Sequence, residues 1–447
     1  MDEIDRATAS SQMTPDSEPR RLFMSPVLAR RIILCLSLLM CALAMAYLLL
    51  KITQLSTLPA GYDFRFIWVA GDMWHAGINP YGPAYLAHGE TNIDTGHIPE
   101  LWPYPPTWWV FAAPLGALDL NTANVVWNIF GLTIVIAICC LLTSAFTTAF
   151  PERSQMLADF TGRQIYVPLF SVLFFLLAIL EATAILFSVG QTTLVAGLGI
   201  AAMLWSRVSG RIFFEAVGLT LVLLKPQIGA PFVVLYLLFD AHSRKVVLMA
   251  ILLSALLTLP SLVTAPSTIL DFFRNLAAYD GFTIANLPQS MTGLRLIIWE
   301  VTGLDVGSSA ATIITLAIIL ALCYGPTRLT RASDANEHTW QVFGLASAAI
   351  VALAPLHIYD FVLLAAPLAL LFRGRAISIV FAGLGALLIW RSENLAGIWA
   401  FHVEGVEIFP SSRLATIGAL LFLVAVIDTV LQLNRENANA SNQPSRA

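Results

Sequence analysis

The composition of this chain indicates the solvent in which it folds. Of its 447 residues, 58% are apolar and 12% are charged, about half of the ~25% typical of soluble proteins. A soluble chain of this kind could not cover its surface with polar groups, so we expect an integral membrane protein. The net charge of −4 gives no support to nucleic-acid binding. The five cysteines lie in apolar segments without metal-ligand spacing.

Apolar segments follow one another along the chain, and we expect an all-α membrane domain over residues 32–433. The polar tails 1–31 and 434–447 are predicted to be disordered and cytosolic. The first apolar segment is long enough to span a bilayer and is predicted to be an uncleaved anchor. Several other segments are shorter than the ~20 residues that a straight span needs. Such a segment would either line a cavity or extend its span with neighbouring polar residues. The segments are 32–52, 122–146, 166–188, 192–206, 212–224, 228–241, 246–263, 307–325, 340–356, 360–372, 376–390 and 413–433.

The apolar stretch 105–119 is harder to place, because it contains three prolines. If it does not cross the membrane, 17 of the 24 lysines and arginines lie on the inner side and seven on the outer side. A full crossing would move five basic pairs outside, against the positive-inside rule. We therefore predict about 12 spans, both termini in the cytosol, and a re-entrant or interfacial position for 105–119.

The first outer segment, residues 53–105, is rich in acidic and aromatic residues. Five of the eleven tryptophans lie between Trp68 and Trp109, which predicts a segment resting on the membrane surface. Asp63 stands among aromatic neighbours. Partial loss of hydration would raise its pKa and suit it to act as a general base. The alternative is that Asp63 caps a helix or pairs with Arg65.

Four further polar breaks fall on the same predicted outer face. They are Gly190–Gln191, Lys225–Gln227, 286–290 and 355–360. Together with Asp63 they would form a buried site that water can reach. Lys225 is one of three lysines and is suited to grip a phosphate as a point charge, although a lysine at a helix end also snorkels.

Other candidate ligand-binding residues are weaker. His357 and Asp360 could position a hydroxyl or a phosphate, or form a hydrogen-bonded cluster that fixes two helices. Gln191 could bond a sugar or cap a helix. Hydrolase, zinc-protease and P-loop motifs are absent from the sequence. The remaining candidates are two outer cations, which could equally contact solvent or lipid headgroups, one polar side chain of a break and one of the first outer segment: Arg295, Arg391, Gln227 and Tyr104.

Five short motifs occur in an order that resembles glycosyltransferase family 87. They are DFRFIWVAGDMWHAGINPYGPAY (63–85), WPYPPTWWVFAAPLGAL (102–118), GQTTLVAGL (190–198), LLKPQIGAPFVVLYLL (223–238) and APLHIYDFVLLAAPLALL (354–371). Each motif is short, and their shared order carries the resemblance. The matches cover most of the membrane region.

The resemblance implies a GT-C-type bundle in the bacterial inner membrane with its site on the extracytoplasmic face. Such enzymes, mannosyltransferases among them, use polyprenyl-phosphate sugars as donors and lipid-linked glycans as acceptors. An acidic residue of the first outer loop is their base, which implies that role for Asp63. Lys225 and His357 would contact the donor phosphate or the acceptor. We expect one inverting displacement and no cofactor or metal, because a lipid phosphate is already a good leaving group.

Two other classes of function fit parts of the sequence. A transporter or lipid-linked-sugar flippase would explain the many spans and broken helices. It predicts ionisable pairs near the middle of the membrane and inverted repeats, whereas the polar breaks here gather at one face. A non-catalytic membrane scaffold would explain every polar break as a structural feature. The donor sugar, the acceptor and the oligomeric state do not follow from the sequence.

Overall fold

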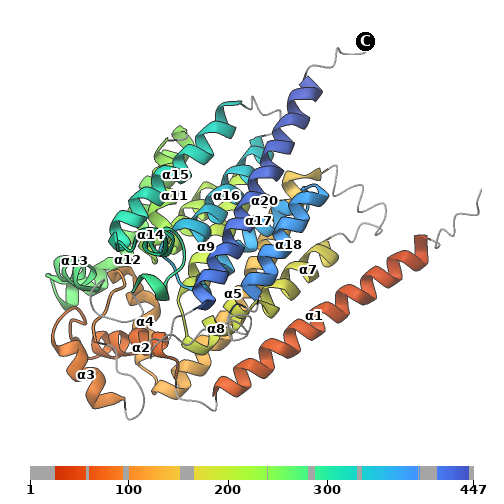
Figure 1. Cartoon of the computed structure of the whole chain (residues 1–447). Helices are drawn as coiled ribbons and strands as arrows, with labels where there is room; N and C mark the ends of the chain where they lie inside the picture. Colours follow the sequence, from red (N-terminus) through yellow and green to blue (C-terminus); the bar gives the residue numbers. More distant parts are fainter. Residues whose placement is uncertain are drawn as a thin grey trace, which may run out of the picture.

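The computed structural model of the protein describes residues 26–56, 60–93, 100–151, 166–238, 240–279, 287–329, 335–390, 392 and 410–441. Within these ranges the chain is all-helical, as predicted, apart from one isolated bridge between Thr292 and Leu356 (Figure 1). The long helices are α1 (Pro26–Ser56), α5 (Leu120–Ala149), α12 (Ala241–Thr264), α15 (Gly307–Leu329), α16 (Ala335–Leu353) and α20 (Pro410–Ser441).

Shorter helices complete the chain. Those of the first outer segment and its continuation are α2 (Tyr62–His75), α3 (Ala84–Asn92), η1 (Pro106–Trp108) and α4 (Trp109–Gly116). Those within the apolar region are α7 (Tyr166–Ile179), α8 (Glu181–Val189), α9 (Thr193–Val208), α10 (Ile212–Leu223), α11 (Pro226–Leu238), η4 (Ile358–Leu364), α17 (Ala365–Leu371) and α18 (Ala376–Trp390). Between α12 and α15 lie α13 (Thr268–Tyr279), η3 (Pro288–Ser290) and α14 (Leu294–Thr302).

Each of the twelve predicted apolar segments is helical, but the helices differ in their capacity to cross a bilayer. Among the described residues, five helices are long and apolar enough to span: α1, α5, α12, α15 and α20. A sixth span results if α7 and α8, which meet at a bend of 61°, are counted together. Several other apolar helices, α9 and α10 among them, have 10 to 17 residues. The protein is thus a helical membrane protein, and the number of twelve spans stays a prediction.

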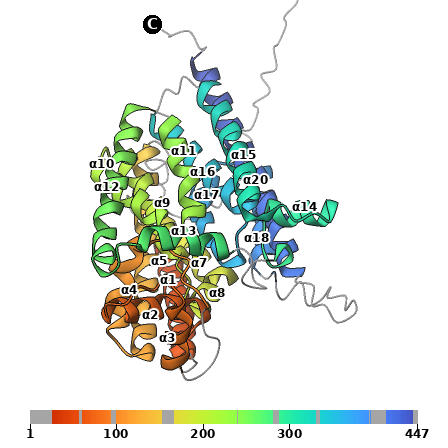
Figure 2. The ribbon, with the colours of Figure 1, turned by 90° about the vertical axis from the view of Figure 1, so that its left-hand side faces the viewer.

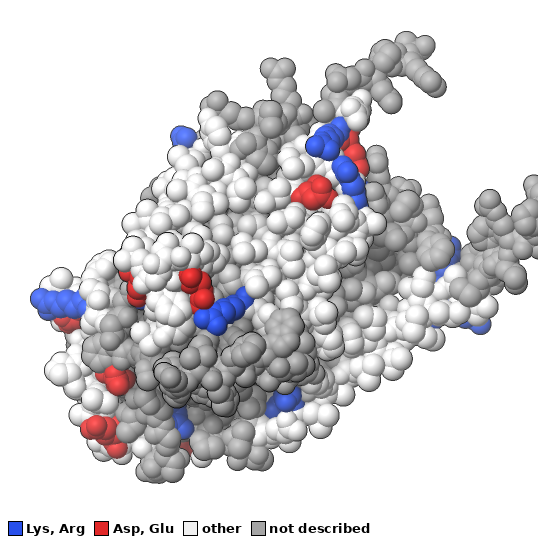
Figure 3. Space-filling view, viewed as in Figure 1, with Lys and Arg blue, Asp and Glu red and all other residues white. Residues whose placement is uncertain are grey.

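The helices form a bundle with two distinct ends. The first turn of α1 and the last turn of α20 lie at the same end, whereas α2, α3 and α4 lie at the other (Figures 1 and 2). On the face seen in Figure 3, charged side chains gather at the two ends and leave a broad uncharged band between them. This distribution fits a bundle whose middle is surrounded by lipid.

The tryptophans of the first outer segment do not lie at an interface with lipid and water, so that part of the prediction is wrong, whereas the position of the segment on the membrane surface stays a prediction. Trp68, Trp74, Trp102 and Trp108 are all buried within the protein. The segment and its continuation fold into α2, α3 and α4, whose aromatic side chains pack together, and α2 and α4 also pack onto α5. Trp68 and Trp108 donate their indole N–H groups to the carbonyl oxygens of Leu118 and Leu224, over 2.9 Å each. Internal hydrogen bonds therefore replace the interfacial water that we expected.

Three boundaries also differ from the prediction. α1 begins at Pro26, inside the predicted tail. A helix does not have to end where its side chains become polar, and proline is tolerated in a first turn. α20 continues to Ser441 for the same reason. The predicted segment 166–188 breaks before Glu181.

Residues 105–119 form η1 and α4, and α4 alone, with eight residues, is too short to cross a bilayer.

Candidate active site

Asp63 lies near the start of α2, where that helix meets the end of α8. The N-cap of α2 is Gly61, not Asp63, so the capping role that we considered for Asp63 does not apply. A Cβ atom on Gly61 would lie 2.4 Å from the carbonyl oxygen of Ser188. Gly190 has a φ of 74°, and a Cβ there would lie 2.4 Å from Cβ of Phe64. Only glycine permits these two close approaches, which bring Gln191 beside Asp63.

Gln191 connects the α8–α9 break to Asp63 by a hydrogen bond. Its side chain bonds the Asp63 carboxylate. Its amide oxygen accepts from the backbone N–H of Thr192 over 2.9 Å, so the amide nitrogen is the donor to Asp63. The same break is fixed by Trp127, whose indole donates to the Gly190 carbonyl over 3.0 Å.

The surroundings of Asp63 raise its pKa. α2 is not among the candidate membrane spans. Burial raises the pKa of Asp63 to about 7, an increase opposed by the Gln191 hydrogen bond and the positive charge of Lys225 and assisted by the negative charge of Asp360. A carboxylate with this pKa is poised to accept a proton near neutral pH. The side chain is half-buried and keeps some accessible surface.

Lys225 and Asp360 form a buried ion pair next to Asp63. Their exposed fractions are 4% and 1%. The Lys225 ammonium donates to Asp360 Oδ1 and, over 2.7 Å, to the hydroxyl of Thr193, which in turn donates to Asp360. The ring of Tyr359 lies 5.2 Å from Nζ. Since an ammonium has three N–H groups, one remains for a ligand oxygen.

His357 forms hydrogen bonds through its ring with Asp360 and with Ser290. One ring nitrogen accepts from the backbone N–H of Asp360, while Asp360 Oδ2 accepts from the backbone N–H of His357 over 3.1 Å. The ring also bonds the Ser290 carbonyl, which joins the 286–290 break to the 355–360 break. This geometry matches the alternative that His357 belongs to a hydrogen-bonded cluster that fixes two helices, and its predicted contact with a phosphate or an acceptor hydroxyl stays a prediction.

The remaining candidates are distributed differently. Gln227 is half-buried in the first turn of α11. Tyr104 packs between Trp102, in a tilted contact, and Trp108, in an edge contact, at ring-centroid distances of 4.9 and 5.8 Å. Arg295 is buried and binds both carboxylate oxygens of Asp305 and the Ser308 hydroxyl, so it connects α14 to α15 away from the cluster. Arg391 lies outside the described residues.

Two members of the site, Thr193 and Tyr359, are not among the residues predicted from the sequence. Thr193 bridges Lys225 and Asp360, and Tyr359 places its ring beside the ammonium. Both residues lie inside motifs of the predicted site, GQTTLVAGL and PLHIYD. Their position beside predicted polar residues is the signal in the sequence that could have identified them. Four of the five predicted breaks thus meet at one point: Asp63, Gln191, Lys225 and Asp360. The fifth contributes the Ser290 carbonyl.

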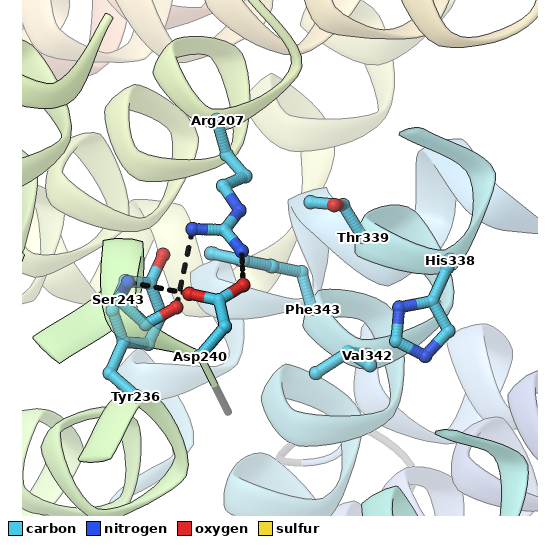
Figure 4. A pocket seen from close by; sticks show the side chains of 8 residues that line it. All are labelled: Arg207, Tyr236, Asp240, Ser243, His338, Thr339, Val342 and Phe343. Carbon is cyan, nitrogen blue, oxygen red and sulfur yellow. Dashed lines mark hydrogen bonds and ion pairs between the residues drawn. The ribbon is translucent and has the colours of Figure 1, made fainter. Parts of the chain in front are cut away.

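No group of three or more His, Cys, Asp or Glu side chains within the described ranges is arranged to hold a metal ion. A separate pocket of about 200 Å³ lies at the other end of α9 (Figure 4). There Arg207 donates to Asp240 over 2.6 Å and to Ser243 over 3.2 Å, with His338 on the facing wall. This pocket shares no lining residue with the Asp63 cluster.

Comparison with known proteins identifies the family. The sequence profile of glycosyltransferase family 87 matches residues 102–357, more than half of the chain. The chain belongs to glycosyltransferase family 87. It is therefore a glycosyltransferase, as the resemblance implied. No curated protein matches the chain. The matched region contains Gln191, Lys225 and His357 but not Asp63 or Asp360, whose assignment rests on geometry.

The pKa of Asp63 predicts how activity depends on pH. If Asp63 is the base of this glycosyltransferase, kcat/KM should fall as pH drops below about 7, because the carboxylate becomes protonated. Gln191→Met removes the hydrogen bond that lowers this pKa, so the acidic limb should move to higher pH. The measurement is the pH profile of kcat/KM.

The control for that profile is Gln227→Met. Gln227 is half-buried at the same end of the bundle, and its side chain makes no hydrogen bond with another described residue. An unshifted limb in Gln191→Met, or an equal shift in both variants, would contradict a role for Gln191 in tuning Asp63.

Proposed function

We propose that the enzyme transfers a sugar, mannose or another hexose or pentose, from a polyprenyl-phosphate donor to a lipid-linked or cell-envelope glycan. The observation that carries this proposal is the proximity of Asp63, with its Gln191 hydrogen bond, to the Lys225–Thr193–Asp360 cluster, whose charges act on the Asp63 carboxylate at one end of the bundle. A base and a phosphate-binding cation are the two groups that such a transfer needs side by side.

In the proposed reaction the acceptor oxygen attacks the anomeric carbon while Asp63 takes its proton. The bond from that carbon to the phosphate oxygen breaks, and its electron pair leaves with the lipid phosphate. The free N–H of Lys225 donates to a phosphate oxygen as its charge grows. A single displacement inverts the anomeric carbon, so that a β-linked donor yields an α-linked product.

Helix orientation supports phosphate binding at this place. α2, α9 and α11 all begin at the cluster, with Asp63, Thr193 and Pro226 in their first turns. Their N-terminal dipoles add positive potential, which matters because Asp360 already balances the charge of Lys225. No step requires a metal or cofactor.

The proposed orientation places the cluster on the extracytoplasmic face of a bacterial inner membrane, with both chain ends in the cytosol. Arg207, Arg211, Arg244 and Lys245 lie at the ends of α9, α10 and α12 that are remote from Thr193 and Lys225. The positive-inside rule assigns that basic end to the cytosol.

A transfer assay in nanodiscs tests the reaction. Purified enzyme would receive radiolabelled polyprenyl-phosphate sugars or nucleotide sugars, together with a lipid extract from its host. We expect label in a new lipid or glycan from a polyprenyl-phosphate donor alone, and an inverted anomeric configuration by NMR. Transfer from a nucleotide sugar or retained configuration would refute the proposal. Movement of intact donor across vesicles without transfer would favour a flippase.

A further inference from the structure

A polar groove of about 320 Å³ lies between the end of α1 and α8, outside the catalytic cluster. Its polar walls consist of Tyr47, Lys51 and Gln54 from α1 and of Glu181 and Ser188 from α8, with aliphatic side chains between them. We call it the α1–α8 groove. Its volume lies at the lower end of the roughly 300–1,000 Å³ of small-molecule sites.

The bend between α7 and α8 creates this groove. At the 61° bend, α8 leaves the direction of α7 and turns one face toward α1. The α8 residues of the groove, 181, 184, 185 and 188, have the i, i+3, i+4, i+7 spacing of one helix face. The α1 residues 47, 51, 54 and 55, spaced i, i+4, i+7, i+8, also lie on one helix face. Two polar helix faces therefore meet at the end of a membrane span.

The groove opens at the depth of lipid headgroups. α1 is a candidate span over Val27–Leu55, so Lys51 and Gln54 occupy its last two turns. Leu43 and Leu50, on other faces of α1, are 53% and 64% exposed, as side chains that contact lipid tails would be. A lysine at the end of such a helix directs its ammonium to the interface.

The two walls carry opposite charges. The ammonium of Lys51 lies 5.9 Å from the Tyr47 ring centroid and forms no ion pair with another described residue. A phosphate oxygen would satisfy it by a charge-assisted hydrogen bond. Glu181 lines the facing wall and suits an amine. We infer that the α1–α8 groove binds a zwitterionic glycerophospholipid headgroup, with its phosphate at Lys51 and its primary amine at Glu181.

This site is close to the catalytic cluster but independent of it. Ser188 lines the groove, and its carbonyl oxygen packs against Gly61, two residues before Asp63. None of the groove residues takes part in the proposed reaction. A failure of the transfer assay would therefore leave this inference unaffected, and the test below measures lipid binding alone.

Native mass spectrometry of the full chain would measure binding of phosphatidylethanolamine, phosphatidylglycerol, diacylglycerol and a polyprenyl phosphate. We expect Lys51→Gln to weaken phosphatidylethanolamine binding about tenfold, the loss of one charge-assisted hydrogen bond, and Lys51→Arg to retain it. Glu181→Gln should remove the preference for phosphatidylethanolamine over phosphatidylglycerol. Lys245→Gln, an exposed lysine on α12, is the matched control and should change nothing.

Two results would overturn the inference. One is equal binding by Lys51→Gln and Lys245→Gln, or binding of diacylglycerol as tight as that of phosphatidylethanolamine. The other is a Lys51-dependent affinity for polyprenyl phosphate alone, which would assign the groove to the lipid carrier.

Discussion

Asp63→Asn is expected to lower kcat by about 10²–10⁴-fold, the usual contribution of a positioned general base. The substitution keeps the size of the side chain and an oxygen that can accept the bond from Gln191. Donor binding should therefore remain, because Lys225, Thr193 and Asp360 are unchanged. Transfer rates and donor affinity, measured in the same nanodiscs, would separate loss of chemistry from loss of binding.

The control for Asp63→Asn is Asp72→Asn on the same helix. Asp72 bonds His88 over 2.7 Å and takes no part in the cluster, so its loss should leave kcat within about twofold of the wild-type value, as surface substitutions usually change little. A comparable loss in both variants would show that α2 needs its charges for folding rather than for proton transfer.

Asp63→Asn should also stabilise the protein, in a way that depends on pH. The folded-state pKa of Asp63, about 7, exceeds the ordinary value of 3.8 for an aspartate, so the wild type loses stability as pH rises from about 4 to 7. Asparagine does not titrate. The gain in melting temperature should be absent near pH 4, increase up to pH 7 and stay constant above it. Ionisation of Asp63, on which the proposed reaction depends, therefore lowers the stability of the folded enzyme.

Lys225→Gln is expected to have the largest effect on stability, about 3–5 kcal/mol of unfolding free energy at neutral pH. It leaves the buried carboxylate of Asp360 without its cation and next to Asp63. Transfer should be lost as well, because no other cation of the described chain contacts the cluster. Denaturation in detergent and the transfer assay are the measurements.

A double variant separates the two losses. Lys225→Gln with Asp360→Asn removes both charges and should recover most of the stability, because a neutral hydrogen-bonded pair replaces an unpaired buried charge. It should not recover transfer. Asp240→Asn is the matched control, since its partner Arg207 and Asp240 itself are partly exposed and such pairs contribute roughly 0–1 kcal/mol. Recovery of transfer by the double variant would exclude Lys225 as a phosphate ligand.

The positions of the helices were largely predictable from the pattern of apolar residues. All twelve apolar segments are helical because each can satisfy its backbone hydrogen bonds internally, as a bilayer requires. The bend before Glu181 was not predicted, since no proline or glycine marks it. The tryptophans of the first outer segment were misplaced because burial against neighbouring helices depends on contacts between residues far apart in the chain.

The sequence by itself determined that this is a helical membrane protein of a glycosyltransferase family and which polar breaks come together in the candidate site. Composition and local motifs suffice for these conclusions. Composition selects the solvent in which the chain folds, and a local motif depends only on a short stretch of backbone. Only the tertiary structure decided that Lys225 binds Asp360 and Thr193, that Gln191 bonds Asp63, and that Arg295 binds Asp305 instead. Partners of buried charges are chosen by the packing of whole helices, which no local pattern encodes.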